Sequence, residues 1–394
     1  MKQKKKRQDQ SGEILNRTCR DIIALTLVSE VGPRKIMALL DQTRETEEIF
    51  RLSPSRMAEI TGGRTSQFEG IRGVRTSEEY ARELEYIERE KIWPVCLRDE
   101  NYPENLKNIY DPPAVLYCRG SLLPDDINAV AIVGARKCSV YGLGMAEKLA
   151  FDLAEKGITV ISGMARGIDS AAHRGALKAG GRTIAVMGSG FRHVYPSESE
   201  RLVRAISEQG AVITEYSSDI MPSKSTFPRR NRIISGMAKA VVVVEAARKS
   251  GAMITVDLAL QQGREVFAVP GRADFYTSSG TNSLIQNGAK LVMNAQDVLE
   301  ELDVSVREEH DAPPRRKAHP GSRSVSGEER KVLKILSTEH SAHIDRLSES
   351  TGTRPAELPE ILLKLEIKGL VKASAGKNYA LNAEITKGAD FYAS

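Results

Sequence analysis

The stretch AVAIVGARKCSVYGLGMAEKLAFDLAEKGITVISGMARGIDSAAHRGALKAGGRTIAVMGSG, residues 129–190, decides the fold. An apolar run from Ala129 to Val133 breaks at Gly134, and an amphipathic helical pattern follows before a second apolar run from Ile158 to Ile161. Continuous apolar runs are typical of parallel strands that are covered on both faces. The pattern therefore predicts a βαβ unit of an α/β, doubly wound sheet, whose strand-to-helix loops meet along one edge.

The turns of this unit do not fit a nucleotide cofactor. A dinucleotide-binding turn needs G-x-G-x-x-G and, about 20 residues later, an acidic residue at the end of the second strand. The first turn here reads Gly134-Ala135-Arg136, and the second strand ends in Ser162-Gly163, so the carboxylate that would hold a ribose is missing. The P-loop pattern G-x-x-x-x-G-K-[ST] is also absent from the sequence. We therefore expect no cofactor, and a phosphate of another kind at the glycine-rich edge.

Length and composition indicate several folded domains and permit a nucleic-acid partner. The chain has 394 residues, of which 41% are hydrophobic, and a net charge of +5, whereas single cores stop growing near about 250–300 residues. No apolar run reaches the roughly 18 residues of a membrane span, and no apolar segment follows the basic start from Met1 to Arg7. The four cysteines lack paired spacing, so we expect reduced thiols and a cytoplasmic chain without a membrane span.

Patterns outside the central stretch predict a helical region and a winged helix. Residues 307–327 are rich in Pro, Ser and charge, which is typical of a flexible linker. Three helical patterns and a hairpin follow, and a winged helix of this kind contacts either DNA or protein. The expected domains are a basic tail at 1–17, a helical domain at 18–93, an extended Rossmann-like domain at 94–306, the linker at 307–327, the winged helix at 328–382 and a tail at 383–394.

One segment of the helical region, Val28 to Ile36, is similar to half of a helix-hairpin-helix. In such a hairpin a glycine turn presents a helix N-terminus to a DNA phosphate. Glu30 stands where a second glycine is favoured, and its carboxylate would repel phosphate. We therefore interpret this region as a helical packing domain, with DNA contact as the alternative.

No group of residues in the sequence forms a catalytic or metal site. The six histidines lack metal-ligand spacing, and no pair of carboxylates stands out. Asp169 follows a glycine turn, where a helix cap is favoured over a general base, and His173 is expected at the surface or as a supporting residue. Ser197 and Glu200 predict a capping box for a helix from Glu198 to Gln209. Farther along, the pattern indicates an apolar strand at Val266–Val269, expected at a sheet edge, and then a loop that holds Ser279–Asn282. We expect the chain not to be an enzyme.

Basic residues and one phenylalanine gather at the loop ends of the predicted sheet. Residues 224–232, KSTFPRRNR, follow the fourth strand, where the pattern indicates a loop to Pro228 and then a short helix from Asn231. Packed arginines repel one another unless an anion, or acidic side chains such as Glu215, Glu245 and Asp257, lie between them. Phe227 offers a face for base stacking, so the set favours single-stranded nucleic acid. The predicted contacts are Arg136, Lys137, Ser139, Gly163, Arg166, Lys224, Phe227, Arg229, Arg230, Asn231 and Arg232.

These motifs also carry a resemblance. The residues concerned are Ile132–Arg136, Ser139, Tyr141-Gly142, Ser162–Asp169, Tyr195-Pro196, Phe227–Gly236, Val266–Gly271 and Gly280–Asn282. In this order they resemble the bacterial DprA/Smf family, DNA processing protein A, over residues 18–382. The resemblance implies a Rossmann-like domain that binds single-stranded DNA, forms a homodimer and loads the recombinase RecA during natural transformation. It also implies that Arg136, Gly163, Lys224 and Phe227 contact the DNA.

The sequence departs from the family pattern at two places, and two other functions remain as alternatives. The sequence departs at Gly190–Val194, where an acidic residue is usual before Tyr195-Pro196, and at Ser197, where some members carry a basic residue. The chief alternative is a nucleotide-binding or nucleotide-cleaving Rossmann enzyme of the lysine-decarboxylase-like type. Those enzymes carry G-G-x-G-T followed by carboxylates, whereas Gly280-Thr281 is followed here by Asn282-Ser283. A third possibility is a protein-interaction scaffold that binds its partner through the winged helix.

Overall fold

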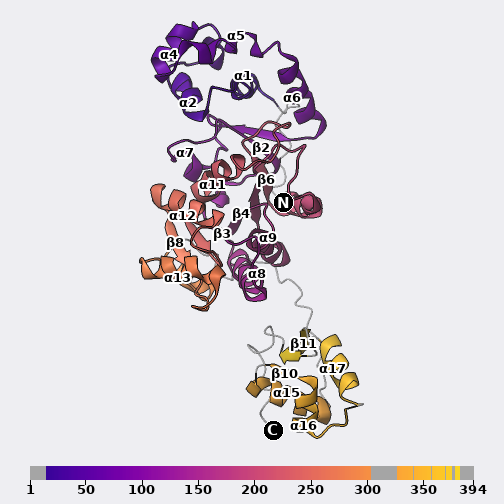
Figure 1. The fold of residues 1–394 in the computed structure, drawn as a ribbon. Coiled ribbons are helices and arrows are strands. Elements are labelled where there is room, and N and C mark those ends of the chain that lie inside the picture. Colours follow the sequence, from indigo (N-terminus) through magenta and orange to yellow (C-terminus); the bar gives the residue numbers. More distant parts are fainter. Residues whose placement is uncertain are drawn as a thin grey trace. The chain divides into compact units, whose positions relative to one another are not determined.

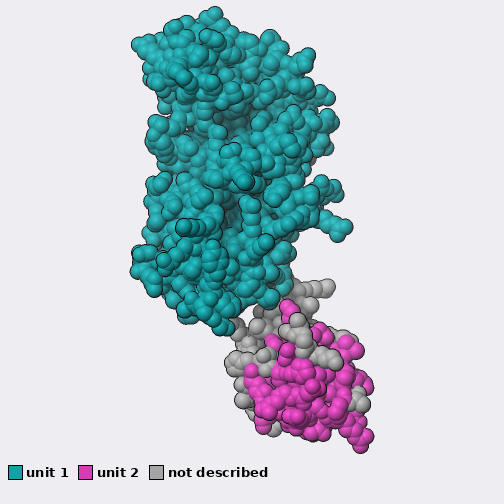
Figure 2. Space-filling model, in the orientation of Figure 1, with its two compact units in different colours: residues 1–310 teal, residues 311–394 magenta. Residues whose placement is uncertain are grey.

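The computed structural model describes residues 15–302, 326–339, 341–355, 357–368, 370–374 and 378–381. The chain forms two compact units, residues 1–310 and 311–394 (Figure 2). Most of the predicted basic tail, most of the predicted linker and the tail at 383–394 lie outside the described residues. Among the helices that the structure describes, none is long and apolar enough to cross a membrane.

The first unit begins with the predicted helical region (Figure 1). Its core is formed by side chains such as Ile22, Leu39 and Phe68, which are fully buried. The longest helix of the region begins after Ser77, whose side chain accepts a hydrogen bond from the backbone N–H of Tyr80. The elements are α1 (Arg17–Thr26), α2 (Pro33–Asp41), α3 (Thr46–Ile49), α4 (Pro54–Thr61), the 3₁₀ turn η2 (Thr65–Phe68), α5 (Ile71–Val74) and α6 (Glu78–Arg89).

A nine-stranded sheet follows, in the order β1-β2-β6-β5-β4-β3-β7-β8-β9. Its strands are β1 (Trp93–Cys96), β2 (Val115–Gly120), β3 (Ala129–Val133), β4 (Thr159–Gly163), β5 (Thr183–Val186), β6 (Ala211–Thr214), β7 (Ala240–Val243), β8 (Glu265–Ala268) and β9 (Lys290–Leu291). Strands β3 to β9 run parallel, and β1 and β2 extend the sheet antiparallel. The chain steps outward from β3 to β6 and then returns to place β7 on the other side of β3. The predicted doubly wound α/β fold is confirmed, with its switch point between β3 and β7.

Helices cover both faces of this sheet because alternate strand residues point to opposite sides. Val130 and Ile132 pack with α8 (Val140–Glu155), α9 (Ile168–Lys178) and α14 (Ala295–Leu299), whereas Ala131 and Val133 pack on the opposite face. The elements of that opposite face are α7 (Glu104–Lys107), α11 (Thr226–Met237) and α12 (Gly251–Gln261). The remaining elements are η3 (Pro124–Ile127), η4 (Ser197–Ser199), α10 (Glu200–Gln209), η5 (Tyr276–Ser278) and α13 (Ser279–Gln286).

Four local predictions were wrong. Helix α11 begins at Thr226, not at Asn231, because Pro228 lies in the first turn, where a missing N–H costs nothing. The predicted capping box is absent, since Ser199 is the N-cap of α10 and makes no side-chain cap bond. The segment Ser279–Asn282, expected in a loop, opens α13. The strand at Val266–Val269 is not an edge strand, because β9 pairs with β8 on its outer side.

In its described residues, the second unit has three helices and a three-stranded sheet in the order β10-β12-β11. Val332, Leu347 and Leu362 are fully buried in its core. Its elements are α15 (Gly327–Glu339), β10 (Ser341–His343), α16 (Ile344–Thr351), α17 (Leu358–Ile367), β11 (Val371–Ser374) and β12 (Asn378–Leu381). The predicted winged helix is confirmed, and the structure adds the short strand β10.

Candidate nucleic-acid interface

The chain's own carboxylate fills the switch point of the sheet. Ser139 caps α8, accepting from the Gly142 N–H at 3.0 Å, and its own backbone N–H donates to Glu245 Oε2 at 2.9 Å. The Ser139 hydroxyl donates to the other oxygen of Glu245. A Cβ on Gly142 would lie 2.6 Å from Glu245 Cδ, so the carboxylate rests against the helix N-terminus. A helix N-terminus at the switch point is where a dinucleotide phosphate would bind, and here Glu245 takes that place.

An aromatic cluster lies beside this point, formed by Phe227, Tyr195 and Arg136. The Phe227 ring, in the first turn of α11, packs on Gly188, where an added Cβ would lie 2.8 Å from the ring. Its centroid is 5.7 Å from that of Tyr195 and 5.0 Å from the Arg136 guanidinium carbon. Arg136 and Tyr195 are exposed and Phe227 is half-buried. The cluster therefore offers both a flat apolar face and a positive charge to solvent.

Four further predicted cations stand at the surface near the same loop ends. Lys137 and Lys224 are exposed and have no hydrogen-bond or ion-pair partner among the described residues. Arg166 pairs with Glu198, and Arg229 lies 3.6 Å from Glu215. Because the Arg166–Glu198 pair is exposed and such pairs contribute little, Arg166 can exchange its partner for a phosphate. Arg229 is exposed itself but lies beside the buried Glu215.

Two predicted contact residues are buried instead. Arg230 and Arg232 are each 4% exposed. Arg232 forms an ion pair with Glu215 and lies 3.2 Å from an Asp111 carboxylate oxygen. Burial raises the pKa of Glu215, and the Arg232 guanidinium opposes that rise. Internal pairing is thus the correct alternative for Arg232, which positions α11 and does not face solvent.

Of the three acids weighed as internal partners, only Glu215 has that role in the structure. Glu245 binds Ser139 instead, and Asp257 is exposed on α12. Asn231 is half-buried, with its amide nitrogen 3.5 Å from the Gly251 carbonyl. Glu215 therefore balances Arg229 and Arg232, with Asp111 as a second partner of Arg232.

Gly163, the last residue of β4, lies between two buried charges. A Cβ there would approach Arg230 Nη1 to 2.3 Å and Asp169 Oδ2 to 2.5 Å. Arg230 also donates to the Val186 carbonyl. The predicted cap role of Asp169 was wrong, because Gly167 is the N-cap of α9 and Asp169 lies in the first turn. Burial raises the pKa of Asp169, while the positive charge of Arg230 acts in the opposite direction.

The buried side chain of His173 holds the end of β4 at Gly163 in place. Its Nε2–H donates to the Gly163 carbonyl at 2.9 Å, and its Nδ1 lies 2.7 Å from the Thr183 hydroxyl. The ring is fully buried, so the expected surface position was wrong and the supporting role stands. Burial lowers the pKa of His173 from 6.5 to about 4.

This pKa predicts a loss of stability in acid. The folded chain releases a proton that the unfolded chain holds, so the contribution of His173 is complete above pH 6.5 and is lost as the pH falls toward 4. We expect the urea midpoint to fall more steeply over this window in the wild type than in His173→Gln, which keeps a donor but does not titrate. His193→Gln is the matched control and should keep the wild-type slope. Equal slopes in the wild type and His173→Gln would contradict the prediction.

The sequence did not identify Tyr195 as a contact, nor Glu245 as the ligand of the α8 N-terminus. Tyr195 was visible only as part of a Tyr-Pro pair, and its approach to Phe227 depends on the loop between β5 and α10. The signal available was Gly188, since a glycine after a strand permits close approach by a ring, here that of Phe227.

Comparison with known proteins places the central sheet and the winged helix in described families. A family of DNA recombination-mediator protein A matches residues 93–303, and the DprA winged helix domain matches residues 315–377. The chain is 41% identical to DNA processing protein DprA of Bacillus subtilis over 222 residues, 56% of this chain and 75% of that protein. It is 38% identical to Protein Smf of Escherichia coli over 278 residues, 70% of this chain and 74% of that protein.

A solved structure has the same fold. The X-ray structure of DNA processing protein A from Streptococcus pneumoniae superimposes with a TM-score of 0.64 at 35% identity. The match covers 74% of this chain and 100% of that chain.

Proposed function

Because the chain belongs to the DNA recombination-mediator protein A family, we propose that it binds single-stranded DNA and loads the recombinase RecA onto it, protecting incoming strands in natural transformation. The observation that carries the DNA-binding part is the aromatic cluster. In it Arg136 lies over the half-buried Phe227 where the loops leave the carboxyl ends of the parallel strands. An unpaired base has a free π-face to stack there, and its phosphates meet the surrounding cations. The family's description supports the mediator part.

The proposed contacts divide by physical role. Phe227 stacks a base, with Tyr195 beside it. The exposed cations that meet phosphates are Arg136, Lys137, Arg166, Lys224 and Arg229. Gly163, Ser139 and Asn231 complete the proposed contact surface at the strand ends. The buried Arg230 and Arg232 hold α11 in place.

This arrangement favours a single strand over a duplex. A duplex keeps its bases stacked on one another inside the helix, so none is free to lie on Phe227. Phosphate contacts alone would bind both forms. The preference therefore depends on the ring and not on the charge.

The test is binding of an oligo-dT strand by the whole chain and by a chain that ends at residue 307. We propose that the primary DNA site lies in the central domain, at residues 94–306, so the shortened chain should keep most of the affinity and its salt dependence. Fluorescence anisotropy against salt concentration measures both, with ATP and NAD titrated alongside as competitors. Loss of nearly all binding in the shortened chain would place the primary site in the winged helix, and displacement by micromolar NAD would favour a nucleotide site.

We also propose that the chain forms a homodimer through the central domain. Exposed apolar side chains lie on α12 and in the segments that follow β8 and β9. Strand β8 contacts α12, as Figure 1 shows, and pairs with β9. They include Leu260, Tyr276 and Met293, which are 60%, 75% and 61% exposed. Apolar side chains gathered at a sheet edge are typical of an interface.

The dimer should survive removal of residues 308–394, and light scattering on the shortened chain measures this. The pair Tyr276→Glu and Met293→Glu should give monomers, because a buried interface would then hold two unpaired carboxylates in each protomer. Ile127→Glu, which places a charge on an apolar residue 43% exposed at η3, is the control and should leave the dimer intact. A shortened chain that is monomeric would move the interface to the C-terminal unit.

A further inference from the structure

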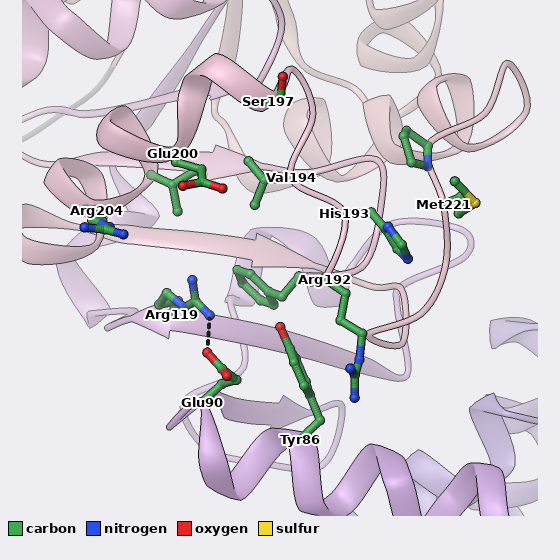
Figure 3. A pocket seen from close by; sticks show the side chains of 13 residues that line it. Tyr86, Glu90, Arg119, Arg192, His193, Val194, Ser197, Glu200, Arg204 and Met221 are labelled. Carbon is green, nitrogen blue, oxygen red and sulfur yellow. Dashed lines mark hydrogen bonds and ion pairs between the residues drawn. The ribbon is translucent and has the colours of Figure 1, made fainter.

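A cavity of about 600 Å³ lies away from the Phe227 ring, between α6 and the loop that follows β5 (Figure 3). Tyr86 of α6 and Glu90, the C-cap residue of α6, form one wall, and Arg119 of β2 lies next to them. The opposite wall comes from residues 191–194, Ser197, α10, Met221 and Pro222. A volume of this size is in the range of small-molecule sites, roughly 300–1,000 Å³. The α6 cavity, as we call it, thus joins the helical region to the sheet.

Flat guanidinium groups over aromatic rings line this cavity. The Arg192 guanidinium carbon lies 4.2 Å from the centroid of Tyr86, and that of Arg119 lies 4.9 Å from the centroid of Phe191. Bases of single-stranded nucleic acid stack on aromatic rings and on arginine planes alike. The walls therefore offer two surfaces of the kind that an unpaired base uses.

Among the described charged groups that line the cavity, Arg204 and Glu200 have no ion-pair partner. Arg119 lies 3.5 Å from Glu90, and Arg192 lies 3.0 Å from Asp219 outside the cavity. Arg204 of α10 also lines the cavity, is exposed and has no hydrogen-bond or ion-pair partner among the described residues. A phosphate that entered with a base would find this guanidinium unpaired.

The same loop lines the α6 cavity and the aromatic cluster. Val194 and Ser197 face the cavity, whereas Tyr195, which lies between them, contacts Phe227. Consecutive Cα atoms are about 3.8 Å apart, so the two sites are separated by the thickness of one chain segment. A DNA strand with one base stacked on Phe227 would pass over Tyr195 before it reached the cavity.

We propose that the α6 cavity holds one nucleotide of a single DNA strand that is already bound at the aromatic cluster. The base lies against the guanidinium–aromatic pairs, and the phosphate meets Arg204. This inference rests on the proposed function. It adds a second base subsite and gives the helical region, through Tyr86, a direct part in DNA binding.

Two arginines of α10 allow a matched test in the whole chain. Arg201 and Arg204 are both exposed and have no hydrogen-bond or ion-pair partner in the part of the chain that the structure describes, but only Arg204 lines the cavity. Arg204→Ala should weaken binding of a long oligo-dT roughly fivefold or more and flatten the log-affinity against log-salt slope by about 0.7. Arg201→Ala should leave both close to wild type. Equal losses in the two variants would reduce the effect to general charge and overturn the cavity as a subsite.

Photo-cross-linking separates a strand nucleotide from a free one. An oligomer that carries 5-iododeoxyuridine should label the peptides with Tyr86 or with Phe191–His193, and excess dUMP should not compete. Labelling by free 5-iodo-dUMP but not by the oligomer, or no labelling by either, would overturn the proposal. If these arms fail while Phe227→Ala still weakens binding, the proposed function stands without this subsite. If the wild type does not bind the strand at all, the proposed function itself is wrong.

Discussion

Phe227→Ala should weaken binding of oligo-dT by roughly 1–3 kcal/mol, with almost no change in its dependence on salt, because stacking releases few counterions. Arg136→Ala should instead flatten the log-affinity against log-salt slope by about 0.7, the value for one phosphate contact on a single strand. The two side chains touch, with 5.0 Å between the guanidinium carbon and the ring centroid, so their effects should not add. Anisotropy titrations of both variants and of the double variant at several salt concentrations measure these quantities.

The control for Phe227→Ala is a second exposed ring that has an arginine stacked over it. Tyr110 is 72% exposed and lies under Arg34 at 4.1 Å, but it belongs to the segment between α7 and β2 and not to the open edge of the sheet. Tyr110→Ala should leave affinity and slope unchanged. Phe227→Ala should also lose much of the preference for single strands. A wild type that binds duplex equally well would rule out the ring as the source of selectivity.

The sheet could be predicted because its signals are local. The apolar run Ala129–Val133 predicts a strand with the bounds that the structure gives β3. Five consecutive small or β-branched apolar residues between polar turns are too few for a helix and are typical of a buried strand. The parallel arrangement followed from the same runs, because only strands covered on both faces are apolar throughout. The antiparallel pairing of β2 with β6 joins segments almost 100 residues apart, and no local pattern specifies it.

The exposure of the predicted contact residues could be predicted only in part, because charge in a sequence does not reveal burial. Residues 229–232 contain three arginines that look alike, yet Arg229 is exposed while Arg230 and Arg232 are buried. The difference arises from what each side chain meets in the fold. Arg230 reaches the Val186 carbonyl and Asp169, and Arg232 reaches Asp111 and Glu215. These partners lie far from residues 229–232 in the sequence or on other elements, so no local pattern separates the three arginines. The α6 cavity had no signal, because its walls come from separate segments that only the fold brings together.

Arg230 carries a buried positive charge at the carboxyl end of β4, and the structure of this strand end depends on its counter-charge. It is fully enclosed beside Gly163, and among the described groups Asp169 is the carboxylate that favours its charged form. Its Nε has no hydrogen-bond partner in the described part of the chain. Removing one member of a buried pair leaves the other charge uncompensated, which costs far more than the pair itself contributes.

Asp169→Asn should therefore destabilise the first unit by about 3 kcal/mol, because the Arg230 guanidinium stays buried without its counter-charge. The double variant Asp169→Asn/Arg230→Met should recover much of that loss, since no buried charge then remains. Urea unfolding measures both, and Asp257→Asn, an exposed carboxylate on α12, is the control that should stay within about 0.5 kcal/mol of wild type. The double variant also tests the predicted phosphate contact of Arg230. If it folds and keeps the wild-type salt slope for oligo-dT, Arg230 holds the edge in place without touching the DNA, whereas a slope flatter by about 0.7 would return it to the contact set.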